Sequence, residues 1–181
     1  MKIIGISGKK GAGKDTVCDY LKKNIRDEHG CEPVKHHIID KLQMIYISLF
    51  TDDFKYYLAE TQEFKDGIAV NGKTNRQNMQ EIGMFMREID PDVWVNYFLK
   101  EAKGMRHDPI MLMPGIRFPN EVKAIHDLGG KVIRLTRCPH PEDKHESETA
   151  LDSVSSRLHY NNDGLYKTHS INTELYFDAT V

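Results

Sequence analysis

Apolar residues along the chain follow two alternating patterns, and together these predict a parallel sheet connected by helices. Four short apolar runs have the composition of strands that are buried on both faces of such a sheet. They lie at 3–6, 34–39, 110–113 and 132–136. Between these runs apolar residues recur every three or four positions, which is typical of one face of a helix. The alternation predicts an α/β protein with three layers, in which helices cover both faces of the sheet.

The helical pattern is clearest in five segments, at about 17–29, 42–49, 75–88, 91–103 and 119–128. Several of these segments have recognisable ends. Gly30 is a plausible stop for the first helix. Asp90-Pro91 is a typical helix start, with an N-cap followed by proline at the first helical position. Residues 174–177 predict the start of one more helix near the end of the chain.

The composition is that of one globular domain. Of the 181 residues 39% are hydrophobic and 29% are charged, so we expect a single domain over residues 1–181. The net charge of −2 gives no reason to expect a nucleic acid polymer or a membrane as a partner. No apolar run approaches the length of a membrane span. Three cysteines without a C-x-x-C pair favour the reducing cytoplasm.

A glycine-rich segment, GKKGAGKDT, joins the first strand to the first helix at residues 8–16. It fits the G-x-x-x-x-G-K pattern of phosphate loops, in which backbone N–H groups surround an anion. The lysine of this pattern reaches the β- and γ-phosphates of a nucleoside triphosphate. Asp15 stands where the usual motif has the Ser or Thr that binds Mg²⁺, so Asp15 and Thr16 are the predicted metal ligands. The residues predicted to bind ATP in this segment are Gly11, Ala12, Gly13, Lys14, Asp15 and Thr16. The alternative is an ordinary glycine turn at the start of a helix.

Polar residues that follow the other strands are the next candidates, because parallel sheets bind ligands at the carboxyl ends of their strands. Asp40 ends the second strand, where its carboxylate is expected to orient the surroundings of the acceptor phosphate or to hold metal-bound water. The alternative role of Asp40 is the N-cap of the next helix. Arg117 and Glu121 follow the third strand, where an arginine is well placed to bind a transferred or an acceptor phosphate. Arg134 and Arg137 lie at the end of the fourth strand, where they are expected to bind the triphosphate or stack on its base.

Residues of about 41–105 are predicted to form the helical region that binds the acceptor. Arg76 lies in the first turn of a helix, where a cation is unfavourable unless an anion is bound; the alternative is a solvated basic surface. Gln80, one turn further, has the paired donor and acceptor that a nucleobase edge requires. Trp94 is a candidate for the wall of the acceptor site, although aromatic residues at this spacing more often belong to a core. The helix surface from Met79 to Met86 suits either a core or a homodimer.

The stretch CPHPEDKHESET, residues 138–149, has two prolines, many charged residues and no periodicity. Such a sequence is typical of a flexible loop, and here it predicts a lid that closes over a charged ligand. Ser147 and Glu148 lie at its far end. The alternative is a zinc site made of its cysteine and two histidines, but a fourth ligand is missing and the spacing fits no common zinc pattern.

These segments together resemble the deoxynucleoside monophosphate kinases best known from bacteriophages. The matching pieces cover most of the chain and are SGKKGAGKDT, IIDKL, TNRQNMQEIG, DPDVWVNYF, IRFPNEVKAI, VIRLTR and HESE. The resemblance implies a P-loop NTPase fold and an enzyme that uses ATP and Mg²⁺ to phosphorylate a deoxynucleoside monophosphate, in the host cytosol if the protein is viral. The residues that it places near the monophosphate are Lys10, Arg76, Trp94, Arg117 and Glu121, and those in the closing segment are Arg137, Ser147 and Glu148. The predicted catalytic residues, which would stabilise the oxygens of the transferred phosphoryl group, are Lys14, Arg117 and Arg137.

Gly115 departs from the family pattern, because the family typically has an Asp at this place, two residues before Arg117. The resemblance implies that such an Asp would act on the Mg²⁺ as the corresponding carboxylate does in related folds. Two alternatives to the family activity therefore stay open. One is a P-loop kinase of another phosphorylated acceptor, of the phosphomevalonate or dephospho-coenzyme A type. The other is a nucleotide-binding protein with impaired catalysis.

Overall fold

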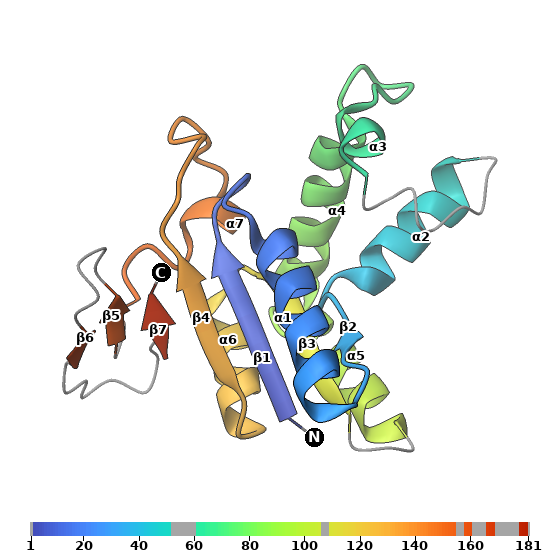
Figure 1. The fold of residues 1–181 in the computed structure, drawn as a ribbon. Coiled ribbons are helices and arrows are strands. Elements are labelled where there is room, and N and C mark those ends of the chain that lie inside the picture. Colours follow the sequence, from blue (N-terminus) through green and yellow to red (C-terminus); the bar gives the residue numbers. More distant parts are fainter. Residues whose placement is uncertain are drawn as a thin grey trace. The chain divides into compact units, whose positions relative to one another are not determined.

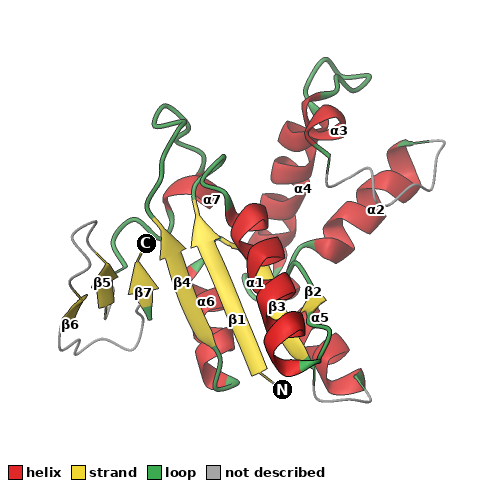
Figure 2. Cartoon of the chain, in the orientation of Figure 1, coloured by secondary structure: helices red, strands yellow, loops and turns green. Residues whose placement is uncertain are grey.

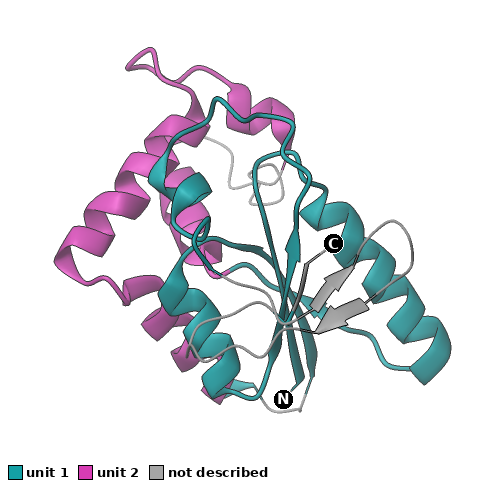
Figure 3. Ribbon diagram, turned by 90° about the vertical axis from the view of Figure 1, so that its left-hand side faces the viewer, with its two compact units in different colours: residues 1–37, 104–181 teal, residues 38–103 magenta. Residues whose placement is uncertain are grey.

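The computed structural model describes residues 2–51, 61–105, 109–154, 158–160, 166–168 and 178–180. These residues form strands and helices along the chain (Figure 1, Figure 2). The chain divides into two compact units, which are coloured separately in Figure 3. Unit 1 comprises Met1–His37 and Gly104–Val181, and unit 2 comprises Ile38–Lys103. The expectation of one domain over the whole chain stays a prediction.

Unit 1 is built on a sheet with the strand order β2-β3-β1-β4-β7-β5-β6. The first four strands in this order are parallel to their neighbours, as the sequence pattern predicts. Their bounds are Lys2–Gly8 for β1, Val34–Lys35 for β2, Ile110–Ile116 for β3 and Lys131–Leu135 for β4. The bounds of the others are Leu158–Tyr160 for β5, Tyr166–Thr168 for β6 and Ala179–Thr180 for β7. β7 pairs parallel with β4 and β5, whereas β6 is antiparallel to β5. The sequence pattern does not predict these last three strands, and the helix expected at 174–177 lies outside the described residues.

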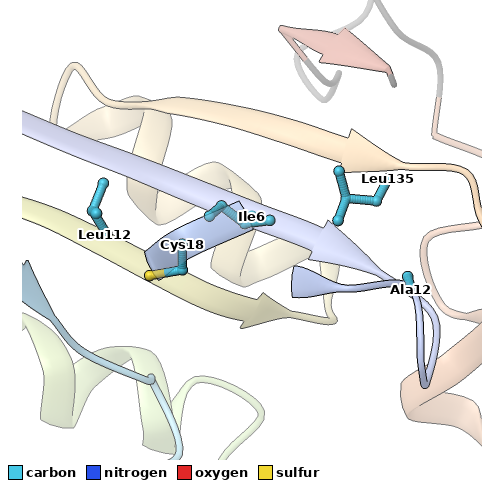
Figure 4. Packing of buried hydrophobic residues seen from close by; sticks show 5 residues of the cluster. All are labelled: Ile6, Ala12, Cys18, Leu112 and Leu135. Atoms are coloured by element: carbon cyan, nitrogen blue, oxygen red, sulfur yellow. The ribbon is translucent and has the colours of Figure 1, made fainter. Parts of the chain in front are cut away.

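Helices cover both faces of the parallel part of this sheet (Figure 1). α1 (Lys14–His29) packs on one face through a cluster of buried side chains (Figure 4). The residues labelled there are Ile6, Ala12, Cys18, Leu112 and Leu135. α6 (Pro119–Asp127) covers the other face so closely that a Cβ on Gly5 would lie 2.8 Å from Ile125 Cδ1. Unit 1 is therefore an α/β structure with helices on both sides of a parallel sheet, which is compatible with a P-loop NTPase fold.

The second strand ends earlier than the sequence predicts, at Lys35 instead of Ile39. The His36 N–H still donates to a carbonyl of β3, at 3.0 Å, but the chain then turns into a helix. Asp40 therefore does not end a strand, and that part of the prediction is wrong. It is the first residue of α2 (Asp40–Phe50), where a carboxylate interacts favourably with the helix dipole.

The described residues of unit 2 are mainly helical, and α2 is the first of these helices. The others are α3 (Gln62–Asp66), α4 (Asn75–Ile89) and α5 (Val93–Gly104). α4 begins where predicted, with a reciprocal capping box between Thr74 and Gln77. α5 begins two residues after Pro91, the predicted first residue. α2 and α4 approach closely at Gly83, where a Cβ would lie 3.1 Å from Leu42 Cδ2. No helix among the described residues has both the length and the apolar character needed to cross a membrane.

Candidate functional site

The predicted phosphate loop connects the carboxyl end of β1 to the N-terminus of α1. Gly11 and Gly13 have φ angles of 72° and 96°, a left-handed conformation that glycine adopts without strain. Gly13 is also the N-cap of α1. A Cβ on Gly11 would lie only 2.7 Å from Pro139 Cγ. The backbone of this loop therefore requires glycine at both positions, whereas binding of ATP by the loop stays a prediction.

Lys14, the first residue of α1, is 9% exposed. Its Nζ donates to the carbonyl oxygens of Gly8 and Lys9, both at 2.8 Å. Burial, followed by the charge of Arg117, lowers the pKa of Lys14 from 10.5 to about 7. An anion placed beside this ammonium would favour its charged form and raise its pKa again. Lys14 is therefore a buried cation whose charge responds strongly to an anionic ligand.

Arg117 follows β3, and two features fix its backbone. The register between β1 and β3 shifts at Gly115, which has a φ of 91°. Glu121 is 1% exposed, and its Oε2 accepts the backbone N–H of Arg117 at 2.7 Å and that of Phe118 at 3.2 Å. Glu121 thus accepts the backbone N–H of the N-cap residue of α6, Phe118, and holds the turn that carries Arg117. A contact between Glu121 and the substrate stays a prediction.

Arg134 lies in β4 and its guanidinium extends to neighbouring elements of unit 1. Nη1 donates to Ser7 Oγ at 2.9 Å, and this hydroxyl in turn donates to the carbonyl of Ile116 at 2.9 Å. Nη2 donates to Asp152 Oδ1 at 3.2 Å. Burial lowers the pKa of Arg134. These contacts hold the guanidinium at the carboxyl end of β1, beside the loop.

The chain returns to the phosphate loop through residues 136–154, which we call the lid segment. It contains a short helix, α7 (Glu146–Thr149), near the carboxyl end of β1 (Figure 1). His145 caps this helix, because its Nδ1 accepts the backbone N–H of Ser147 at 3.2 Å. The lid segment includes the predicted lid at 138–149, and its closing motion stays a prediction.

Two carboxylates of the lid segment contact the phosphate loop. Glu148 is buried, and its Oε2 accepts the backbone N–H of Lys10 at 2.7 Å and lies 2.5 Å from Arg117 Nη1. Asp152 Oδ2 lies 2.8 Å from Lys9 Nζ, and Asp152 Oδ1 accepts a hydrogen bond from the guanidinium of Arg134. Each carboxylate thus joins one residue of the loop to one arginine of unit 1.

The predicted metal ligands, Asp15 and Thr16, are exposed in the first turn of α1. Asp15 Oδ1 lies 2.9 Å from Lys35 Nζ and 4.0 Å from His37 Nε2. Within the described part of the chain, no three His, Cys, Asp or Glu side chains are grouped so as to hold a metal ion. The alternative zinc site in the lid is therefore not formed. Mg²⁺ that binds together with a nucleotide needs only one or two protein ligands, because phosphates and waters supply the rest.

The predicted acceptor residues Arg76, Gln80 and Trp94 all lie in unit 2. Arg76 Nη2 donates to Gln62 Oε1 at 3.1 Å, and Gln80 is half-buried on α4. Trp94 is 2% exposed, and its indole N–H donates to the carbonyl of Gly83 at 3.2 Å. Trp94 is thus part of the core of unit 2, and the roles of all three residues at the acceptor stay predictions.

Several of the predicted site residues in unit 1 come together at the loop. They include Lys10, Lys14, Arg117, Arg134 and Glu148, and the carbonyl of Ser147 lies 3.4 Å from Arg117 Nη1. Arg137 is exposed after β4. Ser7, Lys9 and Asp152 are not among the predicted site residues. Lys9 is a variable position of the loop motif, Ser7 and Asp152 belong to no motif, and each contacts a residue more than a hundred positions away. The acidic character of the lid segment is the one sequence feature that points to Asp152.

Comparison with known proteins finds distant relatives in viruses. No protein-family model matches the chain. It is 28% identical over 171 residues to a protein of Acanthamoeba polyphaga mimivirus named "Putative deoxynucleotide monophosphate kinase", an alignment that covers 86% of this chain and 85% of that protein. It is 27% identical over 155 residues to the uncharacterized protein ORF77 of Ictalurid herpesvirus 1 (strain Auburn), covering 82% of this chain and 58% of that protein.

A second protein of the same herpesvirus, the uncharacterized protein ORF76, is 25% identical over 160 residues. That alignment covers 83% of this chain and 56% of that protein. The chain thus spans little more than half the length of the two herpesvirus relatives. A kinase-like relationship is supported at this distance by the name of the mimivirus relative, and the resemblance to bacteriophage enzymes stays a prediction.

Proposed function

We propose that this protein transfers the γ-phosphoryl group of ATP to a deoxynucleoside monophosphate. An oxygen of the acceptor phosphate attacks the γ-phosphorus, the bond from this phosphorus to the β,γ-bridging oxygen breaks, and ADP leaves. The acceptor phosphate is already ionised at neutral pH, so the reaction requires no strong protein base. The observation that carries the proposal is the buried Lys14 at the start of α1, with the charges of Arg117 and Arg134 close enough to influence its pKa.

Positive charge at this point suits phosphoryl transfer, because negative charge spreads over the oxygens of the transferred group. In the proposal Lys14 binds the β- and γ-phosphates, and Arg117 binds the transferred or acceptor phosphate. Arg134 binds the triphosphate, and Arg137 adds a further cation from the segment after β4. The backbone N–H groups of the loop bind the remaining phosphate oxygens.

Mg²⁺ fits the donor set of the loop only as an ion shared with the nucleotide. Asp15 supplies one carboxylate and Thr16 one hydroxyl, and both are exposed at the start of α1. When bound, Mg²⁺ neutralises charge on the β- and γ-phosphates. Asp15 Oδ1 also lies 2.9 Å from Lys35 Nζ, so Mg²⁺ would share this carboxylate with a lysine.

The choice of acceptor rests on two lines of support outside the loop itself. The mimivirus relative, which aligns with 86% of this chain, is named for deoxynucleotide monophosphates. The segments that resemble the kinases of bacteriophages include Arg76, Gln80 and Trp94 in unit 2. In the proposal these helices bind the deoxynucleoside monophosphate.

A coupled assay of ADP release tests the proposal, with ATP, Mg²⁺ and a panel of acceptors. The panel holds the common deoxynucleoside monophosphates, their ribonucleotide counterparts, phosphomevalonate and dephospho-coenzyme A. We expect turnover with deoxynucleotides, and we expect Lys14→Met to lower kcat/KM by about 10²–10³-fold or more. Lys123→Met is the control, because Lys123 is exposed on α6 and pairs with Asp127. Turnover with phosphomevalonate or dephospho-coenzyme A alone would change the substrate class, and ATP binding without turnover would indicate impaired catalysis.

A further inference from the structure

We propose that the lid segment carries a built-in competitor for the anionic ligand, and that a polyphosphate, but not a single phosphate, releases this segment from the loop. Glu148 and Asp152 bind the very groups that phosphate oxygens would bind, so the ligand has to displace both carboxylates. The identity of the natural ligand rests on the proposed function, but the competition itself concerns any polyanion at the loop.

Glu148 is in the position of a bound anion. Its side chain is 4% exposed, and one oxygen accepts both the Lys10 backbone N–H and the guanidinium of Arg117. Backbone N–H groups of phosphate loops and arginine guanidinium groups are the donors that bind phosphate oxygens elsewhere. Each N–H of this kind serves one strong acceptor at a time, so a phosphate oxygen on Lys10 N–H excludes the carboxylate.

Asp152 makes the second contact between the lid segment and the loop, with two cations. Its two oxygens bind Lys9 Nζ at 2.8 Å and Arg134 Nη2 at 3.2 Å. The lid segment also lies directly against the loop, since Pro139 Cγ is 2.7 Å from the place of a Cβ on Gly11. Two carboxylates therefore offset the charges of the loop lysines and strand-end arginines, which would otherwise repel one another.

The two carboxylates contact different residues of the loop, so one phosphate group does not release both of them. Glu148 contacts the loop at Lys10 and Asp152 contacts it at Lys9, each with its own arginine. A single phosphate replaces one carboxylate and leaves the other lid contact intact. A chain of phosphates replaces both, and the lid segment is then released from the loop.

Calorimetric titration with sodium tripolyphosphate and with orthophosphate tests this inference without a nucleotide. In Glu148→Gln the neutral amide competes less well, and we expect tripolyphosphate to bind about tenfold more tightly than to the wild type. Asp152→Asn is the second variant, because Asp152 is 45% exposed and its replacement poses less risk to folding; we expect a gain of about threefold. Glu146→Gln is the matched control, because it removes the same charge from an exposed position of α7.

The rate of amide hydrogen exchange in the wild-type protein distinguishes release of the lid segment from a change in charge alone, because a change in charge alone would leave this rate unchanged. The amide N–H groups of Glu148, Ala150 and Asp152 donate within the lid segment, at 2.8–2.9 Å. We expect tripolyphosphate, and not orthophosphate, to speed their exchange. Weaker binding by both variants, slower exchange of these amides, or no binding of tripolyphosphate to any form would overturn the inference. The kinase proposal fails separately, if tripolyphosphate behaves as expected but no acceptor supports ADP release.

Discussion

The charge state of Lys14 gives a quantitative prediction about nucleotide binding. Its pKa in the free protein is about 7, mainly because of burial, whereas the unperturbed value is 10.5. A triphosphate beside the ammonium raises this pKa, because the anion favours the charged form. At about pH 8 about nine tenths of the free molecules then take up a proton at Lys14 when they bind. The affinity falls as the pH rises above 7, by about tenfold per pH unit at the limit.

Titration calorimetry in two buffers with different enthalpies of ionisation measures this proton uptake. The ligand is a non-hydrolysable ATP analogue with Mg²⁺, at about pH 8. Lys14→Met is the control, because it keeps every proton that the nucleotide itself gains or loses. We expect the wild type to take up about 0.9 proton more than the variant.

Arg117→Gln gives an independent check of the cause, because the charge of Arg117 is the second contribution to the lowered pKa. Without that charge the pKa of Lys14 rises, so fewer protons are taken up on nucleotide binding at the same pH. Equal proton uptake by the wild type and Lys14→Met would refute the reasoning, since it would show that Lys14 does not contact the bound phosphates as a titrating group.

The remaining predictions concern the free energy of unfolding, measured by chemical denaturation. Gly115→Ala should lower the free energy of unfolding by about 1–2 kcal/mol, because a φ of 91° is strained for any residue with a side chain. The control is Gly104→Ala, which should not lower it, because a Cβ at Gly104 would meet nothing within 4 Å; equal effects of the two changes would contradict this explanation. Trp94→Phe should lower the free energy of unfolding by about 1–2 kcal/mol, because the hydrogen bond from the indole to the Gly83 carbonyl is lost and the smaller ring fills less of the core; a neutral result would show that neither contributes. Between pH 7 and 10.5 the side chain of Lys14 is protonated in the unfolded protein but largely neutral in the folded protein. The free energy of unfolding therefore rises with pH in this window, and Lys14→Met should lack this contribution to the rise.

The sheet and the loop could be predicted from the sequence because their signals are local. Apolar runs mark buried strands, and the spacing of Gly8, Gly13 and Lys14 marks a strand, a turn and a helix in succession. The structure agrees, with four parallel strands and a loop whose glycines adopt left-handed conformations. The second strand was predicted too long, because the pattern at 34–39 does not show that the chain turns after His36 to start α2.

The contacts that shape the candidate site could not be predicted, because they join distant parts of the chain. Glu148 meets Lys10 and Asp152 meets Lys9 across about 140 positions, and the lid segment has no periodicity that fixes its path.

Glu121 could not be assigned for a different reason. Pro119 and Glu121 form a recognisable helix start, yet the same carboxylate also suits a substrate contact, and only the structure shows that it accepts two backbone N–H groups.

Gly115 also has a physical explanation that the sequence does not reveal. It is the residue at which the register between β1 and β3 shifts, and its φ of 91° suits glycine. An Asp at this position, as in the resembling family, would strain this backbone conformation. A Cβ here would lie 3.5 Å from His37 Nδ1, so space alone does not exclude a side chain.

Transfer of labelled phosphate tests the central claim most directly. The protein is incubated with Mg²⁺, a deoxynucleoside monophosphate and ATP labelled in its γ-phosphate, and the products are separated by chromatography. We predict that the label appears in the deoxynucleoside diphosphate, and that Lys14→Met lowers this transfer by about 10²–10³-fold or more. Label that stays in ATP, or that appears only as inorganic phosphate with every deoxynucleotide tested, would contradict it.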